Sequence, residues 1–264
     1  MVTLTPEETT TAKPVKSAER TLQLLETIAS AGEPMPVTEL HSRTGFPRSS
    51  LHQLLHTMAA AQWVQFSSDK SLVAIGTRAL VVGTSYLDRD AALPLAAAML
   101  ERVRSESGYT AHYARRDRDN VLYLATRETS ESHRAASRVG RLLPANATAL
   151  GKALLAELSD AEREAVMGRE AMPLLTAHTI TDPIKLGLDL ETARSAGFAI
   201  EREENTLGVS CVAAAVPYRI PATDAISCSI PLDRADPTEM ARVAAIVRRC
   251  ASDLAEQLRT AGVR

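Results

Sequence analysis

Residues 36–61 read PVTELHSRTGFPRSSLHQLLHTMAAA, and this stretch decides how the first part of the chain folds. Gly45 divides it into two short segments, and Pro47 suits the first turn of a second helix because that position needs no backbone N–H. Apolar residues recur in the second segment at intervals of three and four, which places them on one helix face. The stretch therefore predicts two helices joined by a tight turn, the second over residues 47–61. The residues on its apolar face are Leu51, Leu54, Leu55 and Met58.

The opposite face of the predicted second helix is polar. No acidic residue occurs between Arg48 and Phe66, so this face can approach a phosphate backbone without electrostatic repulsion. That property indicates a helix-turn-helix whose second helix enters a DNA groove. The alternative is a solvated amphipathic helix pair, which is common in globular domains. The candidate DNA-contacting residues on this helix are Arg48, Ser49, Ser50, His52 and Gln53.

The segments on either side complete the pattern of a winged helix. Residues 16–31 have helical spacing of apolar residues and are followed by Gly32. Downstream, residues 63–66 and 71–75 are short extended runs around a polar turn, which predicts a β-hairpin. Three helices followed by a hairpin make a winged helix-turn-helix, and this order favours DNA binding more than any single helix does. Lys70 lies at the predicted wing tip and is a further candidate phosphate contact.

Composition describes a folded protein and excludes several classes. The 264 residues are 45% hydrophobic and 23% charged, with a net charge of −2 that by itself gives no indication of nucleic acid. The first 13 residues are polar and predict a disordered arm rather than a signal peptide. No apolar run approaches the roughly 20 residues needed to cross a bilayer. We therefore expect a cytoplasmic protein with no membrane partner.

Cysteine and histidine spacing gives no indication of a metal or cofactor. The three cysteines, Cys211, Cys228 and Cys250, are widely spaced and form no CxxC pair, so neither a disulfide framework nor a zinc site is expected. His52 and His56 stand four residues apart but lack the glutamate of an HExxH motif. No metal and no cofactor is expected.

The rest of the chain predicts a separate α+β domain. Residues 77–92 have a helical pattern. Such a helix between two domains either transmits a structural change from one domain to the other and pairs with a second chain, or is a passive spacer. In residues 93–264 strands alternate irregularly with helices, which favours one mainly antiparallel sheet flanked by helices. The predicted parts are a disordered arm (1–13), a winged helix-turn-helix (14–76), a linker helix (77–92) and a second domain (93–264). Its predicted helices cover 93–107, 146–155, 160–167, 183–195 and 237–260, and its predicted strands cover 109–116, 121–127, 133–139, 198–202, 210–218 and 225–231.

A small-molecule pocket is predicted within this second domain. Strand alternation over residues 225–231 places Ser227 and Ser229 on one face, and Cys211 shares a face with small alanines. The predicted helix that starts near Thr148, with Asn146 or Thr148 as its candidate N-cap, offers free N–H groups and a positive dipole end, which suit an anion. These features indicate a pocket for a small polar or anionic metabolite; otherwise the serines bond to the backbone and Cys211 is a small buried hydrophobe. The candidate residues are Ala149, Leu150, Glu201, Cys211, Ser227 and Ser229.

Two other functions remain open as alternatives. In a small-molecule-converting enzyme with an appended DNA-binding domain, Cys211 or Ser227 would be the nucleophile and Glu201 the orienting group. The candidate bases are His112, His133 and His178. No GxSxG or catalytic-cysteine signature is present, so we expect a protein that is not an enzyme. A redox sensor built on Cys211 would need a low thiol pKa and solvent access.

Several stretches in a fixed order identify a family resemblance. They are KSAER (16–20), GFPRSSLHQLL (45–55), ASRVG (136–140), PANATALGKA (144–153), EEN (203–205) and GVSCVAA (208–214). With these stretches the chain resembles the IclR family of bacterial transcription regulators from about residue 16 to residue 258. One departure affects the DNA-binding helix: Gln53 stands where the family usually has arginine, which removes one charged contact.

The resemblance implies an architecture and a mode of action. It implies an N-terminal winged helix, a linker helix and a GAF-like effector-binding domain, assembled as homodimers or dimers of dimers on palindromic operators. Such regulators repress or activate transcription in response to a small molecule. By similarity, the effector pocket involves the candidate residues already named from their pattern. The helix start and the hydroxyls, rather than the resemblance, indicate a small carboxylate as the effector, with an aromatic acid among the candidates.

Overall fold

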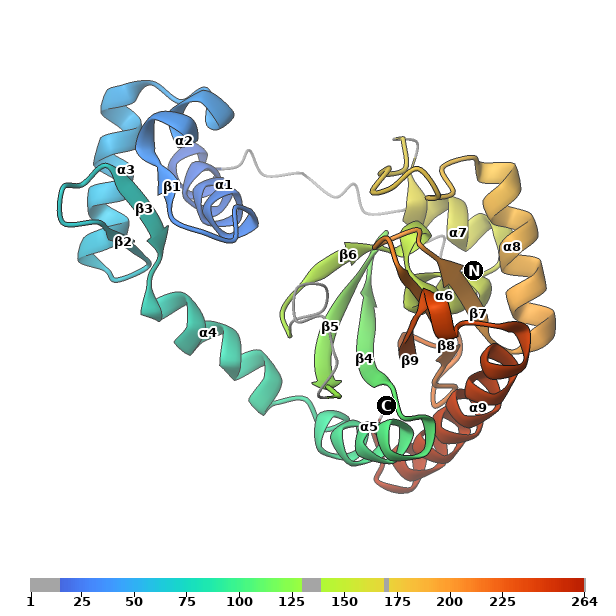
Figure 1. The fold of residues 1–264 in the computed structure, drawn as a ribbon. Coiled ribbons are helices and arrows are strands. Elements are labelled where there is room, and N and C mark those ends of the chain that lie inside the picture. Colours follow the sequence, from blue (N-terminus) through green and yellow to red (C-terminus); the bar gives the residue numbers. More distant parts are fainter. Residues whose placement is uncertain (1–14, 130–138, 169–170, 264) are drawn as a thin grey trace, which may run out of the picture. The chain divides into compact units, whose positions relative to one another are not determined.

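The computed structural model describes residues 15–129, 139–168 and 171–263. The chain divides into two compact units, residues 1–89 and 90–264, which are described separately (Figure 1). The arm predicted at residues 1–13 lies outside the described residues, as does almost all of the strand predicted at 133–139.

The described part of the first unit consists of a bundle of helices α1, α2 and α3, a small sheet and a fourth helix, α4. Its elements are α1 (Lys16–Ser30), β1 (Met35–Pro36), α2 (Val37–Thr44), α3 (Arg48–Ala60), β2 (Val64–Phe66), β3 (Leu72–Ile75) and α4 (Thr77–Asp88). The sheet order is β1-β3-β2, and both pairings are antiparallel. The predicted winged helix-turn-helix is confirmed, with α3 beginning at Arg48 because Pro47 is its extended N-cap.

The core of the first unit holds α3 in place. Leu51, Leu55 and Met58 are buried against α1, α2 and the sheet, while Leu54 is half-buried, as the predicted apolar face requires. Glycine is needed where the hairpin leads into α4. A Cβ on Gly76 would lie 2.2 Å from the carbonyl oxygen of Gln62, so no larger residue fits there.

The second unit is an α+β domain built on one antiparallel sheet. In the described residues its sheet has six strands in the order β6-β5-β4-β9-β8-β7, and the predicted fold class is confirmed. The strands are β4 (Thr110–Asp117), β5 (Asn120–Arg127), β6 (Leu142–Pro144), β7 (Ala199–Arg202), β8 (Val209–Ala215) and β9 (Asp224–Pro231). The helices are α5 (Leu93–Ser107), α6 (Ala149–Ala156), α7 (Asp160–Met167), α8 (Pro183–Ala196) and α9 (Pro237–Thr260).

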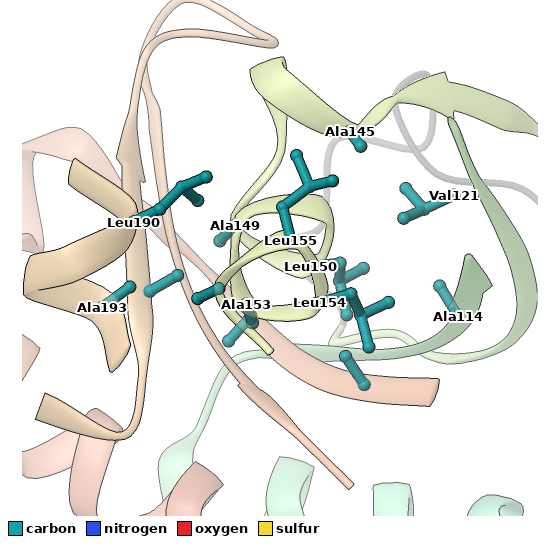
Figure 2. Packing of buried hydrophobic residues seen from close by; sticks show 14 of the residues in the cluster. Ala114, Val121, Ala145, Ala149, Leu150, Ala153, Leu154, Leu155, Leu190 and Ala193 are labelled. Carbon is teal, nitrogen blue, oxygen red and sulfur yellow. The ribbon is translucent and has the colours of Figure 1, made fainter. Parts of the chain in front are cut away.

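Helices cover both faces of this sheet. Helices α5 and α9 pack against each other and against one face, while α6 lies on the other face, where α8 packs against both α6 and β7 (Figure 1). All eight residues of α6 are buried, which its Ala, Leu and Gly content permits. Figure 2 shows Leu150 and Leu154 directed toward the side of Ala114, and Ala149 toward the side of Leu190 on α8. The start of α6 is thereby fixed against the sheet.

Candidate DNA-binding and effector sites

The polar face of α3 is open to solvent. Arg48, Ser49, His52 and Gln53 are exposed, and no carboxylate interrupts them. Because the apolar face of α3 is fixed in the core of the first unit, these side chains project from a rigid support. The face can approach a polyanion without repulsion between like charges.

Ser50 is placed differently from its neighbours. It is half-buried, and its hydroxyl oxygen accepts a hydrogen bond from the Arg20 guanidinium of α1 at 3.2 Å. The same guanidinium lies 4.9 Å from the centre of the Phe46 ring, a distance suited to a cation–π contact. Ser50 therefore helps to fix the orientation of α3 relative to α1.

Lys70 occupies the turn between β2 and β3. It is exposed and has a positive φ of 59°, and it follows a carboxylate that orders the turn. Asp69 accepts hydrogen bonds from the Ser67 hydroxyl at 2.5 Å and the Ser71 hydroxyl at 2.7 Å. These bonds, led by the one from Ser67, lower the pKa of Asp69 to about 2. The wing tip thus presents one lysine beside one aspartate that is ionised at neutral pH.

The second unit contains a cavity between the start of α6 and the sheet. Its volume is about 30 Å³, which is enough for about two water molecules and well below the range for small-molecule sites. The structure brings all the residues predicted for the pocket together on its wall. The lining residues are Tyr123, Thr148, Ala149, Leu150, Glu201, Asn205, Thr206, Val209, Cys211, Ser227 and Ser229.

Strand register explains why three of these side chains meet. Glu201 on β7 pairs with Cys211 on β8, and Cys211 pairs with Ser229 on β9, so the three lie in one row across the sheet. The Cys211 sulfur is 3.3 Å from the Ser229 hydroxyl oxygen. The neighbouring Cys228 points to the other face, where its thiol lies 3.5 Å from the Ser107 hydroxyl of α5. The predicted alternation of β9 therefore describes the observed strand.

Glu201 is a buried carboxylate on the cavity wall. It is 2% exposed, and burial raises its pKa to about 7. Its Oε2 atom accepts the backbone N–H of Glu204 at 2.9 Å. Glu204 in turn pairs with the buried Lys152 of α6, with 2.5 Å between the charged atoms. These contacts anchor the loop that supplies Asn205 and Thr206 to the cavity.

The start of α6 forms the opposite wall. The Thr148 hydroxyl oxygen accepts the N–H of Gly151 at 3.0 Å, which makes Thr148 the N-cap. Asn146, the other predicted cap, is buried and donates to the carbonyl oxygens of Pro173 and Ile180 instead. The cavity wall at Ala149 and Leu150 is thus the positive end of a helix. Glycine is required here, because a Cβ on Gly151 would lie 2.2 Å from the Ala145 carbonyl oxygen.

Known proteins match the chain over both units. The family model of the IclR helix-turn-helix domain covers residues 17–68, and that of the bacterial transcriptional regulator IclR C-terminal domain covers residues 84–256. The transcriptional repressor IclR of Escherichia coli K12 is 32% identical over 244 residues, which span 91% of this chain and 89% of that protein. The chain belongs to the IclR family of bacterial transcriptional regulators.

Solved structures of IclR regulators share the fold. A regulator from Alicyclobacillus acidocaldarius superposes with a TM-score of 0.78 and 22% identity, over 92% of this chain and 99% of that chain. An IclR homologue from Microbacterium hydrocarbonoxydans, solved with 4-hydroxybenzoate, gives a TM-score of 0.74 and 24% identity, over 92% of this chain and 99% of that chain. Both agree with the winged helix and the antiparallel sheet described here.

Several lining residues of this IclR-family cavity escaped sequence reasoning. Tyr123 reaches the cavity from β5, and Val209 from the start of β8. Thr206 comes from the loop between β7 and β8. No local sequence signal identifies these residues as cavity-lining, because their positions depend on how the strands pair. Thr148 was noted as a candidate helix cap and Asn205 as part of a family motif. Neither signal indicated that the residue lines the cavity.

The geometry around the candidate bases does not resemble a nucleophilic triad. The Nε2 atom of His112 is 3.2 Å from the Ser229 hydroxyl, but its Nδ1 atom faces the Thr126 hydroxyl rather than a carboxylate. Burial lowers the pKa of His112 to about 4, which makes it a weak base at neutral pH. His178 is exposed beside Glu203, and His133 lies outside the described residues.

The remaining alternatives also receive little support from the geometry. Burial raises the pKa of the Cys211 thiol well above its usual value, the opposite of what a reactive thiol needs. Among the described residues no group of three or more His, Cys, Asp or Glu side chains is placed to hold a metal ion. Within the same residues, none of the helices has the length and apolar character required to traverse a lipid bilayer.

Proposed function

We propose that this IclR-family protein is a repressor that binds palindromic operator DNA as a homodimer and responds to a small molecule in the second unit. The exposed, carboxylate-free face of α3 carries the proposal, because such a face on a rigid helix is what major-groove recognition needs. Arg48 reads a base or a phosphate, bordered by Ser49, His52 and Gln53, and Lys70 contacts the backbone. A repressor is proposed because the relative from E. coli is named as one.

Support for a dimer comes from α4. This helix has no buried residue, yet four large apolar side chains on it are exposed. Several exposed large apolar side chains on one short helix are typical of protein–protein interfaces. We propose that α4 of a second copy covers it, and that two such dimers associate on longer operators. The exposed residues are Leu80, Val81, Val82 and Tyr86.

The oligomeric state tests this part of the proposal directly. Sedimentation of the full chain is expected to give a dimer or a tetramer. Leu80→Glu combined with Tyr86→Glu is expected to give a smaller species, because charge at both positions opposes burial. A wild-type monomer at micromolar concentration would contradict the dimer.

The cavity supports a small carboxylate as effector, with an aromatic acid as the leading class. The α6 N-terminus offers a positive dipole end at Ala149 and Leu150, while Ser227 and Ser229 supply hydroxyl groups. The homologue from M. hydrocarbonoxydans was solved with 4-hydroxybenzoate, which has this chemistry. The protein would then act in the cytoplasm as a regulator that binds its ligand without converting it.

Operator selection from a random pool of DNA duplexes tests the proposed function. The full chain is expected to enrich a sequence with two-fold symmetry, and Arg48→Ala is expected to weaken binding to it by about 1–3 kcal/mol. Arg43→Ala is the matched control, since Arg43 is an exposed arginine of α2 that pairs with Glu39. Equal affinities for wild type and Arg48→Ala would remove Arg48 from the interface. Failure to enrich any sequence would contradict operator binding.

A further inference from the structure

A row of polar side chains crosses five strands on the α6 side of the sheet. Glu201, Cys211 and Ser229 form its first part, and the Cys211 thiol hydrogen-bonds both Glu201 and Ser229. The row continues through His112 on β4, whose Nε2 atom is 3.2 Å from the Ser229 oxygen. It ends at Thr126 on β5, whose hydroxyl oxygen is 3.1 Å from His112 Nδ1. His112 and Thr126 do not line the cavity, so they act on it through Ser229.

The number of protons in this row restricts its hydrogen bonds. His112 is 3% exposed, and burial keeps it neutral at physiological pH, so its ring has one N–H donor and one acceptor nitrogen. If Nε2 carries the proton, it donates to the Ser229 oxygen and leaves the Ser229 proton for the cavity side. If Nδ1 carries it, it donates to Thr126, and Nε2 takes the Ser229 proton. The tautomer therefore decides whether Ser229 is a donor or an acceptor toward a ligand.

Glu201 sets the direction of the row. When it is ionised it only accepts, so Cys211 donates to Glu201 and has no proton left for Ser229. Ser229 then accepts from His112 Nε2, and its own proton is held only by the Cys211 sulfur, a weak acceptor, until a ligand oxygen in the cavity takes it. When Glu201 is protonated it can donate to Cys211. Cys211 can then donate to Ser229, and Ser229 to Nε2 of His112. The titratable groups that act on Glu201 are Cys211 on β8 and Glu204 on the following loop, and Glu204 is itself paired with Lys152 of α6.

The groups around His112 are uncharged. Ser229 approaches it from β9 and Thr126 from β5, and the Tyr123 ring of β5 is edge-on with 5.5 Å between ring centres. No charged group is required to select its tautomer. The hydrogen bond to Ser229 is therefore the connection between His112 and the state of Glu201.

We propose that His112 is a positioning residue that sets effector specificity by directing the Ser229 hydroxyl proton into the cavity. The inference rests on the proposed effector role of the cavity. In the Nε2–H form the site favours a ligand oxygen that carries no proton, such as a carboxylate, a carbonyl or a phenolate oxygen. In the Nδ1–H form Ser229 is an acceptor and favours a ligand hydroxyl.

The tautomer is measured without any ligand, by NMR of the full chain with ¹⁵N-labelled histidine. His112→Gln identifies the His112 resonances by their loss. We expect Nε2–H at pH 8 and a shift toward Nδ1–H by pH 5.5. Cys211→Ala interrupts the row and is expected to abolish this response. Cys228→Ala is the control, because Cys228 is buried on the other face of β9 and should leave the response intact.

Two results would overturn the proposal. One is Nδ1–H at pH 8 in the wild-type chain. The other is a tautomer that does not respond to pH, or that responds equally in Cys211→Ala. Each of these contradicts the row itself and does not depend on DNA binding.

Calorimetry with 4-hydroxybenzoate as the probe tests the effect on binding. His112→Met removes the ring donor and is expected to weaken binding about tenfold, as loss of one neutral hydrogen bond predicts. His112→Gln keeps an N–H near the same place and is expected to stay within about threefold of wild type. Equal loss in both variants, with thermal unfolding unchanged, indicates that the donor is irrelevant and contradicts the proposal. If the wild-type chain does not bind 4-hydroxybenzoate, the proposed effector class is wrong, and the tautomer measurement alone decides the role of His112.

Discussion

Burial of Glu201 disfavours the ionised form of its carboxyl group. Burial raises its pKa from 4.5 to about 7, so between these values the folded chain holds a proton that the unfolded chain has released. The contribution of Glu201 to the free energy of unfolding therefore falls as pH rises through this window. The glutamine in Glu201→Gln cannot titrate, so the free energy of unfolding of this variant does not fall for this reason. Relative to the variant, wild type is expected to lose up to about 3 kcal/mol between pH 4.5 and pH 7.5.

Urea unfolding of both proteins across this pH range measures the difference. Far-UV circular dichroism follows both units, whereas fluorescence of Trp63, the sole tryptophan, follows the first unit alone. The pH-dependent difference should appear in the dichroism and not in the fluorescence. Parallel stability curves for wild type and Glu201→Gln would show that the carboxyl group titrates normally in the folded chain.

At the residue scale, alternation and capping predicted much of the cavity. Ser227 and Ser229 were placed on one face by the period of a strand, and Thr148 was one of two candidate caps. Ser50 shows the limit of such reasoning. Its place on α3 suggested a DNA contact, but only the tertiary packing of α1 brings Arg20 to its hydroxyl.

At the element scale, helices with clear end signals were predicted at both ends. Helix α7 begins after a capping box made by Ser159 and Glu162, and α9 begins after the N-cap Asp236. By contrast, β1 and β6 have two and three residues and exist because β3 and β5 pair with them. No local signal in the sequence marks strands this short, and neither was predicted.

A buried network organises the start of β9. Asp224 is fully buried and accepts hydrogen bonds from the hydroxyls of Tyr113 and Tyr218 at 2.5 and 2.7 Å. Arg115 donates to the same carboxylate at 2.7 Å and also reaches Asp90, at the start of the second unit, at 2.5 Å. Through these bonds one aspartate joins β4, β9 and the segment that leads into α5.

Asp224→Asn is expected to lower the free energy of unfolding of the second unit by about 3 kcal/mol. The amide keeps the shape but leaves Arg115 and two tyrosine hydroxyls without their charged partner. Asp253→Asn is the matched control, because Asp253 pairs with Arg102 at the surface and should cost less than about 1 kcal/mol. Urea unfolding followed by circular dichroism compares the two variants. Equal small losses would mean that the buried network adds little to stability.

At the scale of the whole molecule, regulation requires that effector binding and operator binding both depend on the same equilibrium between two states of the protein. An effector changes operator affinity only by as much as it prefers one state of the protein over another. The proposed DNA-binding face lies in the first unit and the cavity in the second, so a variant that blocks only the cavity separates the two activities. Such a variant should keep operator affinity and lose the response to the effector.

Ser229→Leu is that variant. Ser229 lines the cavity, and a leucine there occupies space that the ligand needs and removes a hydroxyl that it would contact. Operator affinity without effector is expected to match wild type within about threefold, roughly 0.6 kcal/mol, while release by 4-hydroxybenzoate is lost. Gel-shift titrations with and without the acid measure both quantities. Ser252→Leu serves as control, since Ser252 is an exposed residue of α9 away from this cavity. Normal release of operator by Ser229→Leu would place the effector elsewhere in the protein, and unequal operator affinity would show that the substitution also disturbs DNA binding.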